Sequence, residues 1–411
     1  MRTFVLYLFI ALAVTLPALI MRLGSWHPAP LLAVGLFGSA ILAAGFMLSW
    51  GAETAERFIA QGLILALVAL ITVLPEYAVD FYYAFEAGRD PQSLNVHYAA
   101  ANMTGANRLL VGLAWPLMVL LNRYKTRQSA IVLSPGNRLE IGFLLLASLY
   151  AFVIVFKNRI DLLDTVILGC LFGGYLWRVS RLSKTDEDEA DEPGPAAAIL
   201  TLPPRQQWGI IGGLTLVAGT VILVSAEPFA ESIVLAGRQL GVDEFLLIQW
   251  LAPLASEAPT VSIAVLFVLA GRATNGLAAM ISDKINQWTL LVGMLPLAMS
   301  AGAVGWLALP LDARQHEEFF LTAAQSLFGV ALLLGLRLTL GHATALLLLF
   351  SVQLLLAFHF QDNPALEVAT LTYLGWAYLA LASVLVISNR AQLKVVVTQL
   401  WTGSSPPAPD Q

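Results

Sequence analysis

Six ionisable residues lie inside long apolar stretches of the chain. They are Glu76, Asp80, Arg108, Glu257, Asp283 and Lys284. An ionised side chain at the centre of a membrane helix costs about 2.5–3.5 kcal/mol, so such residues usually serve a function. Four carboxylates at this depth favour binding of cations or protons. A structural network, in which Arg108 and Lys284 neutralise carboxylates, is the alternative.

Prolines flank the two glutamates. Pro75 precedes Glu76, and Glu257 lies between Pro253 and Pro259. A proline inside a helix removes one hydrogen bond and frees a carbonyl. Hard cations take oxygen ligands from carbonyls and carboxylates. We therefore expect both helices to be broken near their glutamates, with Glu76 and Glu257 binding a transported cation.

Asp80 and Thr72 lie four residues on either side of Glu76. Residues four apart share one helix face. Two carboxylates this close repel each other unless a cation or a proton lies between them. The spacing predicts a cation site on this face, to which Thr72 adds a hydroxyl.

The helix after each glutamate carries further polar side chains. They are Asn102 and Asn107 in the first and Asp283, Asn286 and Gln287 in the second. Gly105, between the two asparagines, allows close approach of another helix. The amides can bind a cation or donate hydrogen bonds to carboxylates, and both interpretations remain open.

Lys284 is open to several interpretations. Its ammonium replaces a bound ion as a tethered cation, or it carries a proton. Otherwise the side chain extends to the membrane surface, or it neutralises Asp283. Arg108 is a second candidate for charge compensation or coupling.

The elements that carry these residues are long apolar segments. The chain has 411 residues, of which 58% are hydrophobic and 12% are charged. Apolar runs of about 20 residues fit a bilayer core, and these runs do not alternate as barrel strands do. We predict an all-α polytopic membrane protein of about twelve helices, near residues 4–21, 30–58, 60–85, 94–122, 138–156, 160–180, 208–239, 243–270, 273–308, 317–337, 340–360 and 367–388.

Lys and Arg are concentrated in the loops that this topology places on the side of the N-terminus. Cytoplasmic loops carry such an excess. The pattern predicts a multi-pass protein of the cell inner membrane with both termini cytoplasmic. The net charge of −5 argues against nucleic acid as a partner.

The order of motifs in the first half recurs in the second. Glu76 and Glu257 are as far apart in sequence as Gly112 and Gly293. Five spans in each copy, an odd number, invert the second copy relative to the first, as in many transporters. The predicted organisation is an extra N-terminal helix at 1–29, a first repeat at 30–180, an acidic cytoplasmic linker at 181–207 with disorder at 184–205, a second repeat at 208–360, and an extra helix with a disordered tail at 361–411.

These motifs resemble those of the cation/calcium antiporter superfamily, the sodium/calcium exchanger-like proteins. Thr72–Glu76 is similar to the family's G-T-S-x-P-E motif, and Asn102–Asn107 to its G-N-x-x-G-S-N motif. In the second copy Ala252–Glu257 keeps the glutamate in register, and Asp283 stands in an asparagine position. The resemblance covers roughly residues 30–390 and implies two inverted repeats and cation antiport.

The chain departs from the family pattern at several positions. Val73 and Leu254 replace the motif serine, and Leu110 and Leu291 replace a later asparagine or aspartate. Lys284 adds a positive charge that the family site normally lacks. The resemblance therefore implies antiport but not calcium selectivity, and protons are a candidate coupling ion beside sodium.

The leading hypothesis is a secondary antiporter that exchanges calcium or sodium against sodium or protons by alternating access. Its partners would be the lipid bilayer and inorganic cations, with no resident cofactor; the sequence does not give an oligomeric state. The alternative is a non-transporting sensor or scaffold that retains the fold. The sequence lacks the HExxH, P-loop and GxSxG motifs, so no enzyme is predicted.

Overall fold

The computed structural model describes residues 2–24, 26, 28–55, 73–181 and 195–402. These residues form two compact units. The first comprises Met1–Ala106, Ser183–Leu266 and Ala298–Gly305. The second comprises Asn107–Leu182, Phe267–Leu297 and Trp306–Gln411. The chain therefore passes between the units several times, and helix α5 contributes residues to both.

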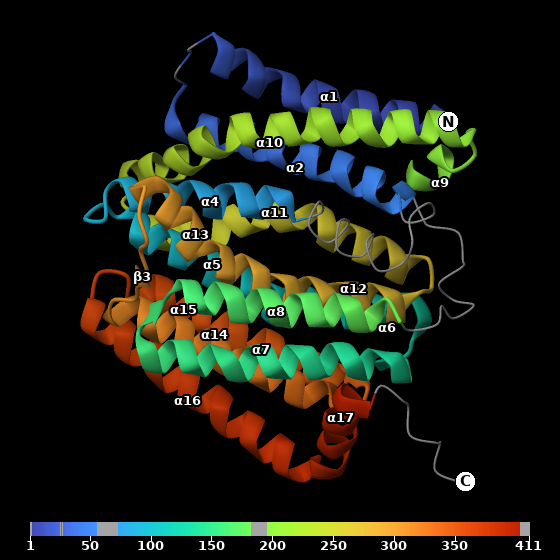
Figure 1. Ribbon diagram of the computed structural model, residues 1–411, viewed down its shortest axis with the longest axis vertical. Coiled ribbons are helices and arrows are strands. Elements are labelled where there is room, and N and C mark those ends of the chain that lie inside the picture. Colours follow the sequence, from blue (N-terminus) through green and yellow to red (C-terminus); the bar gives the residue numbers. More distant parts are fainter. Residues whose placement is uncertain (1, 25, 27, 56–72, 182–194, 403–411) are drawn as a thin grey trace. The chain divides into compact units, whose positions relative to one another are not determined.

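The first unit is built around a layer of three long helices. In it α10 packs lengthwise on α2, and α1 packs against both (Figure 1). Helix α4 packs against α2 and α10 and carries two of the predicted site residues. The helices that contribute to this unit are α1 (Arg2–Leu23), α2 (Pro30–Ala55), α4 (Leu74–Arg89), α5 (Asn95–Leu109), α9 (Pro195–Ile199), α10 (Pro204–Leu240), α11 (Glu244–Leu269) and the end of α13 (Val292–Ala303).

The second unit is a helical bundle in which α14 packs against α7 and α16, and α15 packs against α6. Two short antiparallel strand pairs, β1 with β4 and β2 with β3, form between segments that connect its helices. Its elements are the π-helical turns η1 (Leu110–Ala114) and η4 (Gln287–Leu291), the helices α6 (Trp115–Thr126), η2 (Pro135–Asn137), α7 (Arg138–Lys157), α8 (Leu162–Val179), α12 (Ala273–Asn286), α14 (Ala313–Leu333), α15 (Leu340–His359), α16 (Pro364–Ser388) and α17 (Arg390–Thr402), and the strands β1 (Ala130–Val132), β2 (Arg159–Ile160), β3 (Leu309–Pro310) and β4 (Arg337–Thr339).

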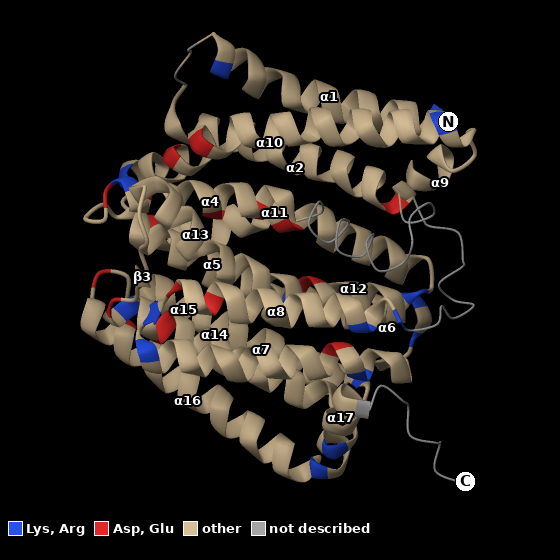
Figure 2. Ribbon diagram, in the orientation of Figure 1, with Lys and Arg blue, Asp and Glu red and all other residues tan. Residues whose placement is uncertain are grey.

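Within the described part of the chain, nine helical segments are long and apolar enough to cross a membrane. Charged residues gather at helix ends and connections, and long stretches between them carry none (Figure 2). Helices α4, α12 and α14 are not among the nine. These three carry buried ionisable side chains, including Glu76, Lys284 and Glu318. These three helices thus hold part of the residues that could do chemistry, whereas Glu257 and Arg108 lie on segments that are among the nine.

The predicted all-α polytopic membrane fold is confirmed. Most predicted helices agree with the observed bounds to within a few residues. Residues 60–72 of one predicted span lie outside the described part of the chain. Helix α17, the two strand pairs and both π-helical turns were not predicted from the sequence. The number of spans, the inverted repeat and the domain boundaries stay predictions.

Two local predictions are wrong. Helix α11 runs without interruption through Pro253 and Pro259, so it is not broken near Glu257. A helix in a packed bundle tolerates proline because neighbouring groups satisfy the freed carbonyls. The disorder predicted for 184–205 is wrong for its described part, because the alanine-rich segment Pro195–Ile199 forms α9 and α10 begins at Pro204.

Candidate cation site

Helix α4 positions Glu76 and Asp80 in the first unit. The helix begins at Leu74 after the non-helical Val73, with Pro75 in the first turn, where its missing N–H costs no hydrogen bond. Glu76 lies in this same turn, where the positive end of the helix dipole stabilises a carboxylate. Asp80 follows one turn later. The two residues are 1% and 0% exposed, so protein surrounds both carboxyl groups.

Asn102 of α5 holds one oxygen of Asp80. Its amide nitrogen donates a hydrogen bond to Asp80 Oδ1 at 2.8 Å. Among the described residues, neither Asp80 Oδ2 nor Asn102 Oδ1 has a hydrogen-bond partner. A buried polar atom without a partner is costly. A carboxylate oxygen and an amide oxygen are therefore available here to a proton or a cation.

Gly105 brings α5 into close contact with α11. A Cβ at Gly105 would overlap the main-chain oxygen of Gln249. That carbonyl lies one turn before Pro253, which has no N–H to donate to it. The Gln249 side chain also lies 3.5 Å from the Thr104 hydroxyl and donates to it. The freed carbonyl of α11 is thus covered by the backbone of α5, and only glycine leaves room for it.

Helix α2 brings the prolines beside the two glutamates together. A Cβ at Gly45 would lie 2.5 Å from Pro259 Cγ and 3.5 Å from Pro75 Cγ. Both proline rings therefore pack against the same point of α2. Glu257 is buried in α11, two residues before Pro259. Within the first unit, the glutamate-bearing parts of α4 and α11 meet at this point.

The second unit holds Asn107 and Lys284. The Lys284 ammonium donates to Asn107 Oδ1 at 2.6 Å and to the Asn107 main-chain oxygen at 3.2 Å. It also lies 4.5 Å from the centre of the Trp288 ring. Lys284 is 0% exposed, so its extension to the membrane surface is wrong. Asn107, predicted as a ligand of a transported cation, accepts hydrogen bonds from this lysine, and its role in cation binding stays a prediction.

Arg108 forms a buried ion pair with Glu318 of α14. Gln325, on the same helix, donates to the Arg108 main-chain oxygen at 3.4 Å. The sequence analysis did not single out Glu318, because it lies at the beginning of an apolar run. The available signal in the sequence was Arg108, because a positive charge at membrane depth needs a carboxylate partner and Glu318 lies within a predicted span.

Two predicted site residues remain, Asp283 and Thr72. Asp283 is buried on α12, and Thr72 lies outside the described residues. In the described ranges, no three His, Cys, Asp or Glu side chains converge closely enough to hold a metal ion.

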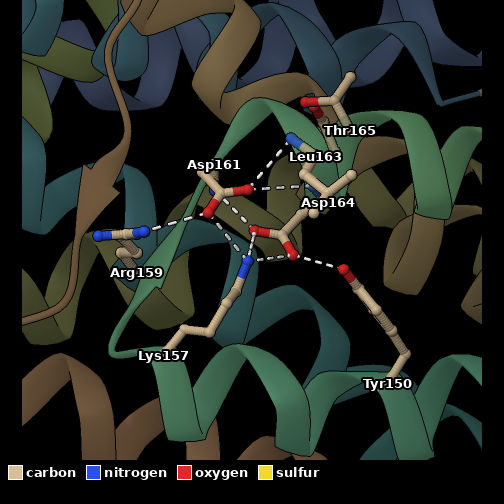
Figure 3. Close-up of polar contacts among 8 residues, drawn as sticks. Tyr150, Lys157, Arg159, Asp161, Leu163, Asp164 and Thr165 are labelled. Carbon is tan, nitrogen blue, oxygen red and sulfur yellow. Dashed lines mark hydrogen bonds and ion pairs between the residues drawn. The ribbon is translucent and has the colours of Figure 1, made fainter.

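A separate polar cluster caps α8 in the second unit. Lys157 contacts Asp164 at 2.7 Å and Asp161 at 3.1 Å, and the Tyr150 hydroxyl donates to Asp164 at 2.6 Å (Figure 3). The Asp161 carboxylate accepts from the main-chain N–H groups of Leu163 and Asp164. Burial by itself raises the pKa of Asp161, but hydrogen bonds, first that from Lys157, outweigh it and lower this pKa below 3.8. The cluster serves as a helix cap.

The sequence matches the family model described as sodium/calcium exchanger protein over residues 27–181 and 210–359. No protein of curated function matches the chain. Among solved structures, it is similar to that of the H+/Ca2+ exchanger CAX, with 40% identity and a TM-score of 0.89, over 97% of this chain and 98% of the other.

Two more distant structures share the fold. The Ca2+/H+ antiporter YfkE is 15% identical with a TM-score of 0.62, over 86% of this chain and 99% of that one. The sodium-calcium exchanger NCX_Mj is 16% identical with a TM-score of 0.53, over 79% of this chain and 99% of that one. At this identity the similarity concerns the fold alone.

Proposed function

This chain belongs to the sodium/calcium exchanger protein family, and from that membership we propose that it is a secondary antiporter that exchanges calcium for protons. The family resemblance found in the motifs is thereby confirmed, and the protein is a multi-pass membrane protein of a family of cation exchangers. Preference for protons over sodium is supported by the 40% identity to the H+/Ca2+ exchanger CAX along nearly the whole chain.

The observation that carries this proposal is the buried pair of Asp80 and Asn102. One oxygen of the Asp80 carboxyl group is held by the Asn102 amide, and the other has no partner among the described residues. A carboxylate in such a place is unstable unless its charge is neutralised by a proton or by a cation. Proton and cation therefore compete for the same group, and this competition couples the two fluxes.

Glu76 and Glu257 complete the proposed cation binding. Both are buried, and the prolines next to them meet on α2. Calcium takes six to eight oxygen ligands, including carboxylates, amides and carbonyls. We propose that Glu76, Glu257, Asp80 and Asn102 supply part of this set, with Asp283 and Thr72 as further candidates. Alternating access of the site to the two sides of the membrane would complete the transport cycle.

The location in the cell is part of the same proposal. The excess of Lys and Arg in alternate loops supports an inner-membrane protein with cytoplasmic termini. Reaction of single introduced cysteines with a membrane-impermeant reagent tests this orientation. A cysteine in the loop after α6 should be protected in intact cells, and one in the α7–α8 loop should react.

Flux in proteoliposomes tests the transport proposal. We expect calcium uptake driven by a proton gradient, and its loss in Glu76→Gln and Asp80→Asn, which keep side-chain size but remove a charge. The matched control is Glu244→Gln, which removes a carboxylate paired at 2.9 Å with the exposed Arg238. This control should exchange calcium at the wild-type rate. Normal exchange by folded Glu76→Gln would exclude the proposed role of Glu76.

The alternative of a non-transporting sensor or scaffold has no support in the contacts or the comparisons. The same experiment separates it from antiport. A sensor would show calcium-dependent stabilisation of the purified protein without any flux under proton or sodium gradients.

A further inference from the structure

Helix α17 of the second unit differs from the membrane-spanning helices in length and direction. It has 13 residues, Arg390–Thr402, which are too few to cross a bilayer core. After α16 ends, α17 turns and runs across to α7 instead of continuing along the bundle (Figure 1). A short helix that crosses the ends of spanning helices has the direction of a helix in the plane of the membrane surface.

The contact between α17 and α7 gives the depth of α17. An added Cβ at Gly142 would lie 2.6 Å from Leu400 Cγ, so the Leu400 side chain packs closely on this glycine. Gly142 lies four residues after Arg138, the first residue of α7, which corresponds to about 6 Å along the helix axis. Interfacial helices lie about 5–10 Å into the boundary between headgroups and acyl chains. Helix α17 therefore lies at the depth of this boundary.

Helix α8 holds the end of α17. The Arg178 guanidinium, in the last turn of α8, donates to the main-chain oxygens of Gln399 at 2.9 Å and Leu400 at 3.1 Å. These oxygens belong to the last turn of α17, where helix carbonyls need partners from outside the helix. A positive charge there also interacts favourably with the helix dipole. Helices α7 and α8 thus fix α17 in one position, with one face left outward.

The outward face of α17 is a stripe of two basic and two apolar residues, spaced by four, three and four positions. They are Arg390, Lys394, Val397 and Trp401. The two basic side chains are exposed, and Val397 and Trp401 are 38% and 83% exposed. The opposite face holds Val396, which is 1% exposed. The stripe is therefore the part of α17 that faces the surroundings of the protein.

This outward stripe fits the surface of a bilayer that contains anionic lipids. Tryptophan is enriched at membrane interfaces, and Lys and Arg extend to the headgroups while their apolar stems lie along the hydrocarbon. Helix α17 carries basic residues and no acidic residue, so its charge is complementary to phosphate headgroups (Figure 2). The end of α8 has the same composition, because the Arg181 guanidinium lies 4.2 Å from the ring centre of Trp177, which is 53% exposed.

We propose that α17 lies in the plane of the membrane and binds the headgroups of anionic phospholipids through Arg390 and Lys394. Trp401 and Val397 then lie at the boundary of the acyl chains. The orientation proposed above places α17 on the cytoplasmic side, where the leaflet carries the anionic lipids. The inference goes beyond antiport and does not depend on which ion is transported.

Amide hydrogen exchange of α17 tests the proposal on the full-length protein in vesicles. Vesicles of phosphatidylcholine are compared with vesicles of phosphatidylcholine and phosphatidylglycerol. We expect the anionic lipid to slow the exchange of α17 about tenfold or more, because each basic residue near an anionic surface contributes a factor of about five. High salt should reduce this difference, because it screens the charges.

Two double variants with the same loss of charge are compared. Arg390→Gln with Lys394→Gln should abolish the effect of the anionic lipid on α17. Arg123→Gln with Lys125→Gln, at the exposed end of α6, should keep it. A second measurement gives the position of Trp401. Its emission, taken as the difference between wild type and Trp401→Phe, should be quenched by lipids whose acyl chains are brominated close to the headgroup.

Equal exchange of α17 in the two kinds of vesicle would overturn the proposal. Slower exchange caused by dissolved glycerol phosphate in phosphatidylcholine vesicles would also overturn it, because the ligand would then be a soluble anion. A lipid effect that persists without Arg390 and Lys394 would exclude these residues as the headgroup ligands. Unquenched emission of Trp401 would show that the stripe faces water or a soluble partner. None of these measurements requires transport, so their failure is distinct from failure of the antiport proposal.

Discussion

Replacement of Gly105 by alanine tests how the close packing of α5 on α11 supports the site. An added Cβ would overlap the main-chain oxygen of Gln249, and its carbonyl carbon would lie 2.7 Å away. These are backbone atoms inside a long helix, so they cannot move aside as a side-chain end does. The two helices must separate if the methyl group is to fit.

The magnitude follows from two opposing terms. Alanine in place of glycine stabilises a helix interior by about 0.5–1 kcal/mol. Extra atoms in a well-packed interior cost about 1–3 kcal/mol, and contact with backbone places Gly105→Ala in the upper part of that range. At Gly213 of α10 an added Cβ would meet no atom within 4 Å, so Gly213→Ala should show only the favourable term. We expect the two variants to differ by about 3 kcal/mol.

Thermal unfolding and calcium flux measure the effect on both variants. For a chain of 411 residues, a difference of about 3 kcal/mol corresponds to unfolding midpoints roughly 3–4 °C apart. Exchange should also slow in Gly105→Ala, because displacement of α5 moves Asn102 away from Asp80 and weakens their 2.8 Å hydrogen bond. If Gly105→Ala unfolds like Gly213→Ala and exchanges at the wild-type rate, this contact does not position Asn102.

Three further predictions concern the second unit. Glu318→Ala should destabilise the protein by about 3–5 kcal/mol in thermal unfolding, because it leaves the Arg108 charge buried without its partner. The pKa of Asp161 lies below 3.8 in the folded protein, so the ionised Asp161 carboxylate stabilises the fold fully above pH 3.8, and this stabilisation is lost on further acidification. Asp161→Asn should remove this pH dependence when the free energy of unfolding is measured in an acid titration. Arg178→Ala should raise the hydrogen exchange of α17, whose Gln399 carbonyl accepts from Arg178 at 2.9 Å.

Each of these has a control and an outcome that contradicts it. Glu244→Ala removes an exposed ion pair and should lower the free energy of unfolding by less than about 1 kcal/mol. An equally small loss of stability in Glu318→Ala would show that burial does not make the Arg108–Glu318 pair more important. An Asp161→Asn protein that loses stability in acid as the wild type does would exclude Asp161 as the group responsible. Unchanged exchange of α17 in Arg178→Ala would show that packing on α7 alone holds that helix.

The sequence by itself determined the membrane helices and the residues at membrane depth. Apolar runs are local properties, and a bilayer sets their length regardless of tertiary contacts. The carboxylates of Glu76, Asp80, Glu257 and Asp283 were each visible alone, because a single charge at membrane depth is costly enough to need a reason; the buried Glu318, at the beginning of an apolar run, was not. Neighbours on one helix or on successive helices, such as Asp80 and Asn102, were therefore within reach of sequence arguments.

Only the tertiary structure decided which distant groups meet. Lys284 binds Asn107, and Arg108 binds Glu318, across long separations in the chain. Periodicity fixes the face of a helix but not the partner that this face contacts. The carbonyl of Gln249, freed by a proline in α11, lies against Gly105 of α5 because two helices pack without an intervening side chain. That choice depends on shape complementarity between whole helices, which no single segment encodes.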